Sequence, residues 1–283
     1  MENSTILFAI SKECPDADLS RILEAARVQS VHVAVLIVGE MPQIPIYSYG
    51  APPYGTTVIP EDWQNEARTE QDALNAKTDA VEALLKRHDV SGDITIVCSE
   101  PSLTASSVAR RAMLCDLAIA SDDLRKKDDL YRQVVHGILF QSPTGVILNS
   151  GAGAALAPKH VLVAWNASLQ CARAVHQSLA ILRQSDAVTV AVFDPEMSEF
   201  QDGENPGSDV AKWLTHHGCN VTVQQLPSGG REIGDCILEQ SRQTGADLIV
   251  MGGYGHSRLR EGIFGGTTRT LVQQTEQPVF LAH

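Results

Sequence analysis

The chain has 283 residues, of which 43% are hydrophobic, and its formal net charge is −12 at pH 7. This length is enough for one large or two small globular domains. No apolar run approaches the ~20 residues of a membrane-spanning helix. The acidic balance argues against a nucleic-acid partner, because no Lys/Arg cluster is large enough to displace many counterions. A nucleotide remains possible, since local N–H dipoles can hold a few phosphates.

The N-terminal residues lack the basic region and cleavage site of a signal peptide, so we expect a cytoplasmic protein. The six cysteines are scattered and form no C-x-x-C pair. This pattern, without a secretory context, favours reduced thiols over disulfides.

The first half alternates apolar strand candidates with amphipathic helix candidates. Unbroken apolar runs such as residues 6–10 are typical of parallel strands covered on both faces. The expected strands are residues 6–10, 31–38, 93–98, 116–120 and 145–149. This alternation predicts an open five-stranded parallel sheet flanked by helices.

The second half repeats the pattern of the first. The same distance separates Ile6 from Val161 and Val33 from Val188. The repeated strands are residues 161–164, 188–193, 221–226, 248–251 and 279–282. We therefore expect the same α/β fold twice, and the small residues between the halves suggest a linker. The predicted boundaries are a first domain at 1–150, a linker at 151–157 and a second domain at 158–283.

An insertion at residues 41–60 interrupts the first half and has no equivalent in the second. It contains five prolines and three tyrosines, so neither helix nor sheet ladder is expected to continue through it. Two interpretations stay open for this loop. Its aromatic side chains could cover a ligand or bind a partner, or the segment could pack inertly over the first domain.

Two glycine clusters in the second half indicate an anion site. Residues 252–255 (Gly-Gly-Tyr-Gly) follow a predicted strand, and residues 265–268 (Gly-Gly-Thr-Thr) precede a predicted helix. Glycines let a ligand approach backbone N–H groups, and the N-terminus of a helix favours phosphate. The first half has Ser-Asp-Asp-Leu-Arg-Lys-Lys-Asp-Asp at 121–129 instead. Its carboxylates would repel phosphate, so we expect a degenerate motif there.

These residues resemble a known family. Gly252, Gly255 and Gly265, placed after a Leu-Ile-Val-Met strand and before the segment 278–281, resemble the nucleotide-binding subgroup of the universal stress proteins. Residues 161–168 also look like the first strand and turn of that family. The resemblance implies a tandem-domain member with two flavodoxin-like, or adenine nucleotide alpha hydrolase-like, domains. It also implies that the two domains pair through their fifth strands.

The resemblance places an adenine nucleotide at the carboxyl ends of the strands in the second domain, as the switch-point rule also predicts. Gly252 and Gly255 would flank the ribose and phosphates, Gly265 and its successors would donate N–H groups, and Val192 would contact adenine. The implied site residues are Ala164, Trp165, Asn166, Val192, Met251, Gly252, Gly255, Gly265, Gly266 and Thr267.

Two departures from the family pattern indicate binding without efficient chemistry. Gly266 intervenes before Thr267, where the family usually has Ser or Thr directly after the last glycine. Asn166 stands where the family usually has Asp, so the charge that could hold a ribose hydroxyl or a metal is missing.

Three functions stay open at this point. The first is a stress-response protein that binds ATP or AMP, possibly with Mg²⁺, and acts through its conformation or an unknown protein partner. The second is a slow Mg-dependent ATP hydrolase, and the third is a ligand-free protein-interaction module. The chain would be an intrachain pseudo-dimer, and a homodimer is possible.

Other chemically suggestive residues have structural explanations. His216 and His217 are expected at a solvated helix end, because adjacent residues point in different directions and no third metal ligand has suitable spacing. Ser168 is expected to cap a helix and Cys171 to lie in the core. We expect neither catalytic residues nor a metal site formed by protein ligands.

Overall fold

The computed structural model describes residues 3–42, 48–49, 56–57, 60–149, 152–195, 205–253 and 266–283. The strands of the first half are β1 (Thr5–Ser11), β2 (His32–Glu40), β5 (Gly92–Ser99), β6 (Leu117–Ala120) and β7 (Val146–Leu148). Those of the second half are β8 (His160–Ala164), β9 (Ala187–Phe193), β10 (Val221–Leu226), β11 (Leu248–Gly252) and β12 (Val279–Ala282). Every strand expected from the apolar runs is confirmed.

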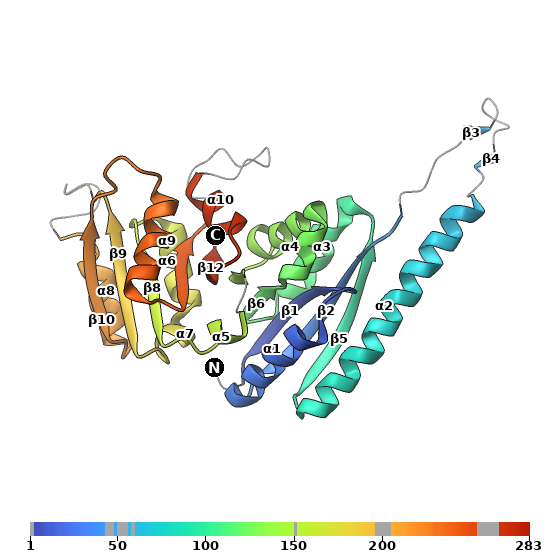
Figure 1. Ribbon diagram of the computed structural model, residues 1–283, viewed down its shortest axis with the longest axis horizontal. Coiled ribbons are helices and arrows are strands. Elements are labelled where there is room, and N and C mark those ends of the chain that lie inside the picture. The colour runs from blue at the N-terminus through green and yellow to red at the C-terminus, as the bar shows by residue number, and fades with distance from the viewer. Residues whose placement is uncertain are drawn as a thin grey trace.

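Helices fill the connections, as Figure 1 shows. The first half has α1 (Asp16–Gln29), α2 (Glu61–His88), α3 (Pro101–Ala112), the 3-10 helix η1 (Asp122–Lys126) and α4 (Asp128–Gln141). The second has α6 (Leu169–Gln177), α7 (Leu179–Leu182), α8 (Ser208–His216), α9 (Ile233–Thr244) and α10 (Gly266–Gln273), preceded by the short α5 (Ala152–Ala155). No helix in the described part of the chain combines the length and apolar character that a membrane span needs.

All ten strands join one sheet in the order β10-β9-β8-β11-β12-β7-β6-β1-β2-β5. In this ten-stranded sheet the pairing is parallel within each half, and the two halves meet at the antiparallel pair of β12 and β7, with Phe280 opposite Ile147. The expected pairing of the two fifth strands is therefore confirmed. Within each half the order is 3-2-1-4-5, as in the dinucleotide-binding fold, rather than the 2-1-3-4-5 of flavodoxin itself. Both orders have a switch point beside the first strand.

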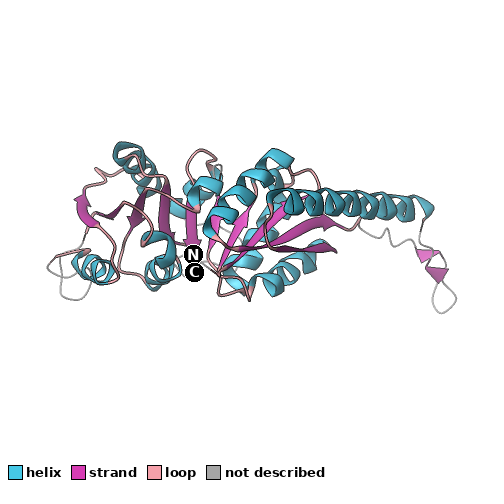
Figure 2. Cartoon of the chain, turned by 90° about the horizontal axis from the view of Figure 1, so that it is seen from below, coloured by secondary structure: helices cyan, strands magenta, loops and turns pink. Residues whose placement is uncertain are grey.

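Helices cover both faces of the sheet (Figure 2). Apolar residues of α1, α2, α6 and α8 pack on one face, and those of α3, α4, α9 and α10 pack on the other. The two cores follow from the sequence, because alternate residues of a fully apolar strand point to opposite faces. In β1, for example, Phe8 lies in one core and Leu7 in the other.

Helix α2 is much longer than the strands that it covers. It has 28 residues, but Leu74 is the first of them to be buried. The preceding turns project past the sheet, and the two-residue strands β3 (Ser48–Tyr49) and β4 (Thr56–Thr57) lie near their tip (Figure 1). Most of the proline-tyrosine insertion lies outside the described residues, so both interpretations of it stay predictions.

The predicted linker is a packed segment. It contains α5, and Ala155 and Leu156 are fully buried. A Cβ on Gly153 would lie 3.3 Å from Arg21 O in α1. The two halves are therefore held together by a continuous sheet and by packing around the connection. The boundaries at 150 and 158 stay a prediction.

Candidate functional site

The candidate site lies where the strand order of the second half reverses. After β8 the chain continues to β9 on one side, and it later returns on the other side as β11. Ala164 at the end of β8 lies opposite Met251 near the end of β11. The two sequence segments predicted to form the site therefore meet at the carboxyl ends of two adjacent strands, β8 and β11. In open α/β sheets such a crevice at the carboxyl ends of the strands is the usual ligand position.

The turn after β8 is held by a compact set of hydrogen bonds. Trp165 N donates to Ala191 O at 2.9 Å, which keeps the chain on the sheet for one more residue. Asn166 Oδ1 accepts from Ser168 N at 3.3 Å and from the Cys171 thiol at 2.9 Å. Because both groups are donors, they fix which end of the Asn166 amide faces inward. The Asn166 side chain is exposed, and its NH₂ group has no hydrogen-bond partner among the residues that the structure describes.

The same contacts settle two structural expectations. Ser168 is the N-cap of α6, and its Oγ accepts a hydrogen bond from Cys171 N at 3.2 Å. Cys171 is 5% exposed and belongs to the protein core. Both expected roles are confirmed.

Gly252 has a packing role that sequence reasoning missed. A Cβ at this position would lie 2.5 Å from Cys171 N and 2.6 Å from Gln170 C, which is closer than real Cβ contacts. The first turn of α6 therefore rests directly on the backbone of β11. The neighbouring Gly253 is different, because a Cβ there would make only ordinary contacts at 3.5 Å and 3.6 Å. Gly252 is thus needed for helix packing whether or not a ligand also approaches it.

Three of the residues predicted to contact the nucleotide are almost fully buried near the ends of their strands. Val192 is 1% exposed, Met251 5% and Ala164 8%. The Val192 side chain also faces Gly207, whose Cβ would lie 3.0 Å from Val192 Cγ2. The Val192 side chain is thus in the core, and its contact with adenine stays a prediction. On the β8 side, Trp165 and Asn166 remain accessible.

The N-terminus of α10 is the other segment that the sequence predicts for the site. Gly266 begins the helix, and Thr267 is half-buried in its first turn. A Cβ on Gly266 would lie 3.3 Å from Glu232 Oε2. A carboxylate that precedes α9 thus lies beside the helix end at which phosphate is expected. Gly255 and Gly265 lie outside the described residues.

Asp194 is a candidate that sequence reasoning did not identify. It directly follows β9, and its Oδ1 accepts a hydrogen bond from Ser228 N at 2.8 Å. Hydrogen bonding to Ser228 holds the pKa of Asp194 below its usual range. A charged, exposed carboxylate is therefore present at the end of the strand next to β8. Its signal in the sequence was its position immediately after a predicted strand.

Metal ligation by the protein has no support among the described residues. They contain no group of three or more His, Cys, Asp or Glu side chains placed to hold a metal ion. His217 follows α8 as its C-cap, and its Nδ1 donates to Trp213 O at 2.8 Å. The expected location of this residue at a helix end is confirmed.

In the first half, the equivalent position at the carboxyl end of β1 is filled by side chains of η1. Asp123 in η1 is 7% exposed, and its Oδ2 accepts from Ser11 N at 2.8 Å. Leu124 beside it is 1% exposed. The Asp123 carboxylate thus accepts the hydrogen bond of the backbone N–H group at the end of β1, and the degenerate nucleotide motif of the first half stays a prediction.

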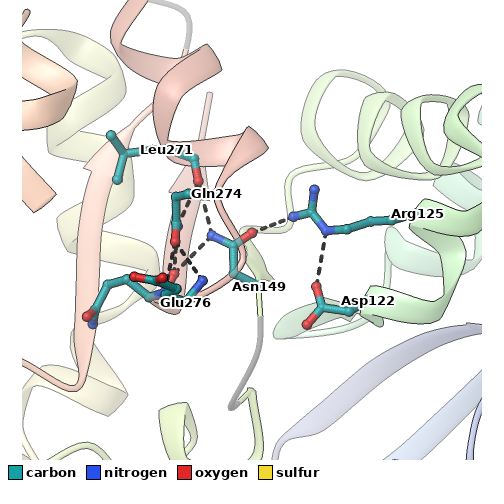
Figure 3. Close-up of polar contacts among 7 residues, drawn as sticks. Asp122, Arg125, Asn149, Leu271, Gln274 and Glu276 are labelled. Carbon is teal, nitrogen blue, oxygen red and sulfur yellow. Dashed lines mark hydrogen bonds and ion pairs between the residues drawn. The ribbon is translucent and has the colours of Figure 1, made fainter.

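Figure 3 shows how η1 is connected to the second half through Asn149. Arg125 of η1 pairs with Asp122 at 3.1 Å and donates to Asn149 Oδ1. Asn149 Nδ2 then donates to Leu271 O at 3.0 Å and to Gln277 O at 2.9 Å. Asn149 is 2% exposed, so this polar link is buried at the junction.

Comparison with known proteins identifies this architecture. Residues 158–283 match the model of the Universal stress protein family. A universal stress protein from Archaeoglobus fulgidus DSM 4304 has a TM-score of 0.69 and 15% identity, with 99% of this chain and 96% of that chain covered. A protein of Pseudomonas aeruginosa UCBPP-PA14 named for the same family has a TM-score of 0.58 and 14% identity, with 99% and 93% covered.

A universal stress protein in complex with cAMP covers only 45% of this chain, at 18% identity and a TM-score of 0.36, which is too low for a comparison of sites. No curated protein sequence matches the chain.

The fold is thus a tandem of two α/β units that share one sheet. The second half, residues 158–283, matches the universal stress protein family in sequence, and the full-length structural matches show that the same fold extends over both halves.

Proposed function

We propose that this stress-response protein binds an adenine nucleotide, ATP or AMP, within residues 158–283 and acts through its conformation or through a protein partner. The observation that carries the proposal is the register of Ala164 with Met251. This register brings the turn after β8 and the start of the glycine stretch to the switch point of the sheet, where ligands bind in such folds.

The accessible groups suit a nucleotide. Trp165 and Asn166 would lie at the adenosine end, where the Asn166 NH₂ group would donate to ring nitrogens or ribose oxygens. The N–H groups at the start of α10 would face the phosphates. Gly252 and Gly255 would flank the ribose and phosphates, and Gly265 would donate N–H groups to the phosphate chain. Asp194 would supply the carboxylate that Asn166 lacks, towards a ribose hydroxyl or a Mg²⁺ ion carried by the nucleotide.

Binding is favoured over hydrolysis. Asn166 is neutral, and its oxygen is already used by Ser168 N and Cys171. A hydrolase would need a water-positioning base, and neither Trp165 nor Asn166 can serve as one. Release of phosphate from ATP in the presence of Mg²⁺, if it is lost in the variant Asp194→Asn, would instead favour the hydrolase.

Calorimetry with ATP, ADP and AMP tests the proposal, together with mass spectrometry of small molecules released on denaturing the purified protein. We expect heat of binding or a co-purified adenine nucleotide, and weaker binding in Asn166→Ala. Asn75→Ala, an exposed amide on α2, is the matched control and should bind as the original protein does. Absence of both signals would favour the ligand-free interaction module.

A further inference from the structure

The first half has an open groove at the base of the projecting part of α2. Its volume is about 740 Å³, and it lies among the end of β2, the N-terminal turns of α2 and the first turns of α3 and α4. It is separate from the switch point of the second half. The lining includes Met41, Pro42, Glu66, Thr69, Pro101 and Asp129.

The groove has unbalanced negative charge. Four carboxylates line it (Glu40, Glu66, Glu70 and Asp129), against one lysine, Lys127. Glu40 pairs with Lys127 at 3.3 Å, and Glu70 pairs with Lys12. Glu66 and Asp129 are exposed and have no ion-pair partner among the described residues. The side chain of Glu70 is 12% exposed, and its buried Oε1 has no hydrogen-bond donor in the part of the chain that the structure describes.

Apolar residues lie beside these carboxylates. Met41 and Pro42 follow β2, and Pro101 begins α3. Trp63 Nε1 donates to Pro42 O at 2.8 Å, which ties one wall of the groove to α2. Lysine and arginine have an apolar stem and a charged head, so they are complementary to an apolar surface edged by carboxylates.

We propose that this groove binds a Lys- or Arg-containing segment of a partner protein. The stem of a basic side chain packs on Met41, Pro42 and Pro101, and its charged head lies between Glu66 and Asp129. The excess of carboxylates excludes anionic ligands such as a second nucleotide. The groove is thus an interaction surface that does not depend on nucleotide binding in the second half.

The test uses fluorescence anisotropy of a labelled hexa-arginine peptide with the full chain, and a labelled hexa-glutamate peptide as the negative probe. The double variant Glu66→Gln/Asp129→Asn removes both unpaired charges without changing side-chain shape. We expect it to weaken hexa-arginine binding about fivefold, from the loss of two exposed ion pairs. Thr69→Lys puts a positive charge into the groove and is expected to weaken binding at least as much.

A matched control distinguishes the groove from the overall acidity of the protein. Glu24→Gln/Asp79→Asn removes two exposed carboxylates of α1 and α2 that do not line the groove. It should bind hexa-arginine as the original chain does. Equal loss in both double variants, no loss in either, or binding of hexa-glutamate would overturn the proposal. So would self-association that Glu66→Gln/Asp129→Asn abolishes, because the occupant would then be a second copy of the chain.

Discussion

Arg125 donates a hydrogen bond to the side-chain oxygen of Asn149, the residue whose side-chain amide reaches across the junction to the second half. Arg125 also stacks over the Tyr131 ring, with its guanidinium carbon 4.3 Å from the ring centroid. Asn149 has a φ of 77°, a left-handed conformation that asparagine adopts more easily than most residues. The buried Asn149 side chain therefore joins η1 of the first half to α10, through Leu271 O, and to the loop before β12, through Gln277 O (Figure 3).

Replacing Asn149 should destabilise the junction. Asn149→Ala removes the hydrogen bonds to Leu271 O and Gln277 O and leaves Arg125 without its acceptor, a loss of about 2–3 kcal/mol in the free energy of unfolding. The Gln274 amide still donates to both carbonyls, which limits the loss. The free energy of unfolding of each variant is measured by urea denaturation. Asn149→Gly should cost roughly 1 kcal/mol less than Asn149→Ala because glycine adopts positive φ freely; equal stability of both variants and the original chain would contradict this account.

Gly252 and Gly253 should respond differently to alanine. Gly252→Ala places a Cβ 2.5 Å from Cys171 N, so α6 must shift, at a cost of roughly 1–3 kcal/mol. Gly253→Ala meets only ordinary contacts and should cost less than about 1 kcal/mol. Thermal unfolding without nucleotide separates the two variants. If both lose the same stability, the packing explanation for Gly252 is wrong. Because of this packing, loss of nucleotide binding in a Gly252 variant is not by itself evidence of a ligand contact.

Glu232 should weaken the binding of phosphate groups at α10. Its carboxylate lies beside Gly266, and a negative charge there competes with phosphate for the positive end of the helix. Glu232→Gln is expected to raise the affinity for ATP roughly two- to fivefold, from the ~0.3–1 kcal/mol of a helix-end charge. Calorimetry measures the change. Asp235→Asn, an exposed carboxylate in the first turn of α9, is the control, and an equal gain there would show only a general charge effect.

Cys14 should react more slowly with alkylating reagents than Cys98 and Cys115. Burial, and then the nearby Asp123 carboxylate, raise the pKa of Cys14 from 9.0 to about 12. The folded state therefore holds this proton more tightly than the unfolded chain, and the resulting stability is present below pH 9 and is lost as the pH rises towards 12. Iodoacetamide at about pH 8, followed by peptide mass spectrometry, should modify the half-buried Cys98 and Cys115 first. Early modification of Cys14 in the folded protein would refute the assignment.

The fold was predictable because its signals are local. Each parallel strand is a short apolar run, and repetition of those runs indicated two copies of one unit. The family resemblance added the pairing of the fifth strands, which β7 and β12 confirm.

The details of the site depend on contacts between distant parts of the chain. Gly252 is followed by another glycine, and its sequence context gives no sign that α6 rests on it. The position of Glu232 beside Gly266 and the burial of Val192 likewise arise from the packing of α9 and α8. The sequence shows that residue 166 is an asparagine. It does not show that Ser168 and Cys171 orient the amide so that the NH₂ group, and not the oxygen, is exposed.

Hydrogen–deuterium exchange of the full chain, with and without ATP, tests the central claim most directly because it reports both binding and its location. We expect slower exchange of backbone N–H groups at residues 164–168 and 266–268 when ATP is present. We expect no change at Ser11 or at residues 121–129, because the Asp123 carboxylate already accepts the hydrogen bond of Ser11 N at the equivalent position of the first half. Protection confined to the first half, or no protection at all at saturating ATP, would contradict nucleotide binding in the second half.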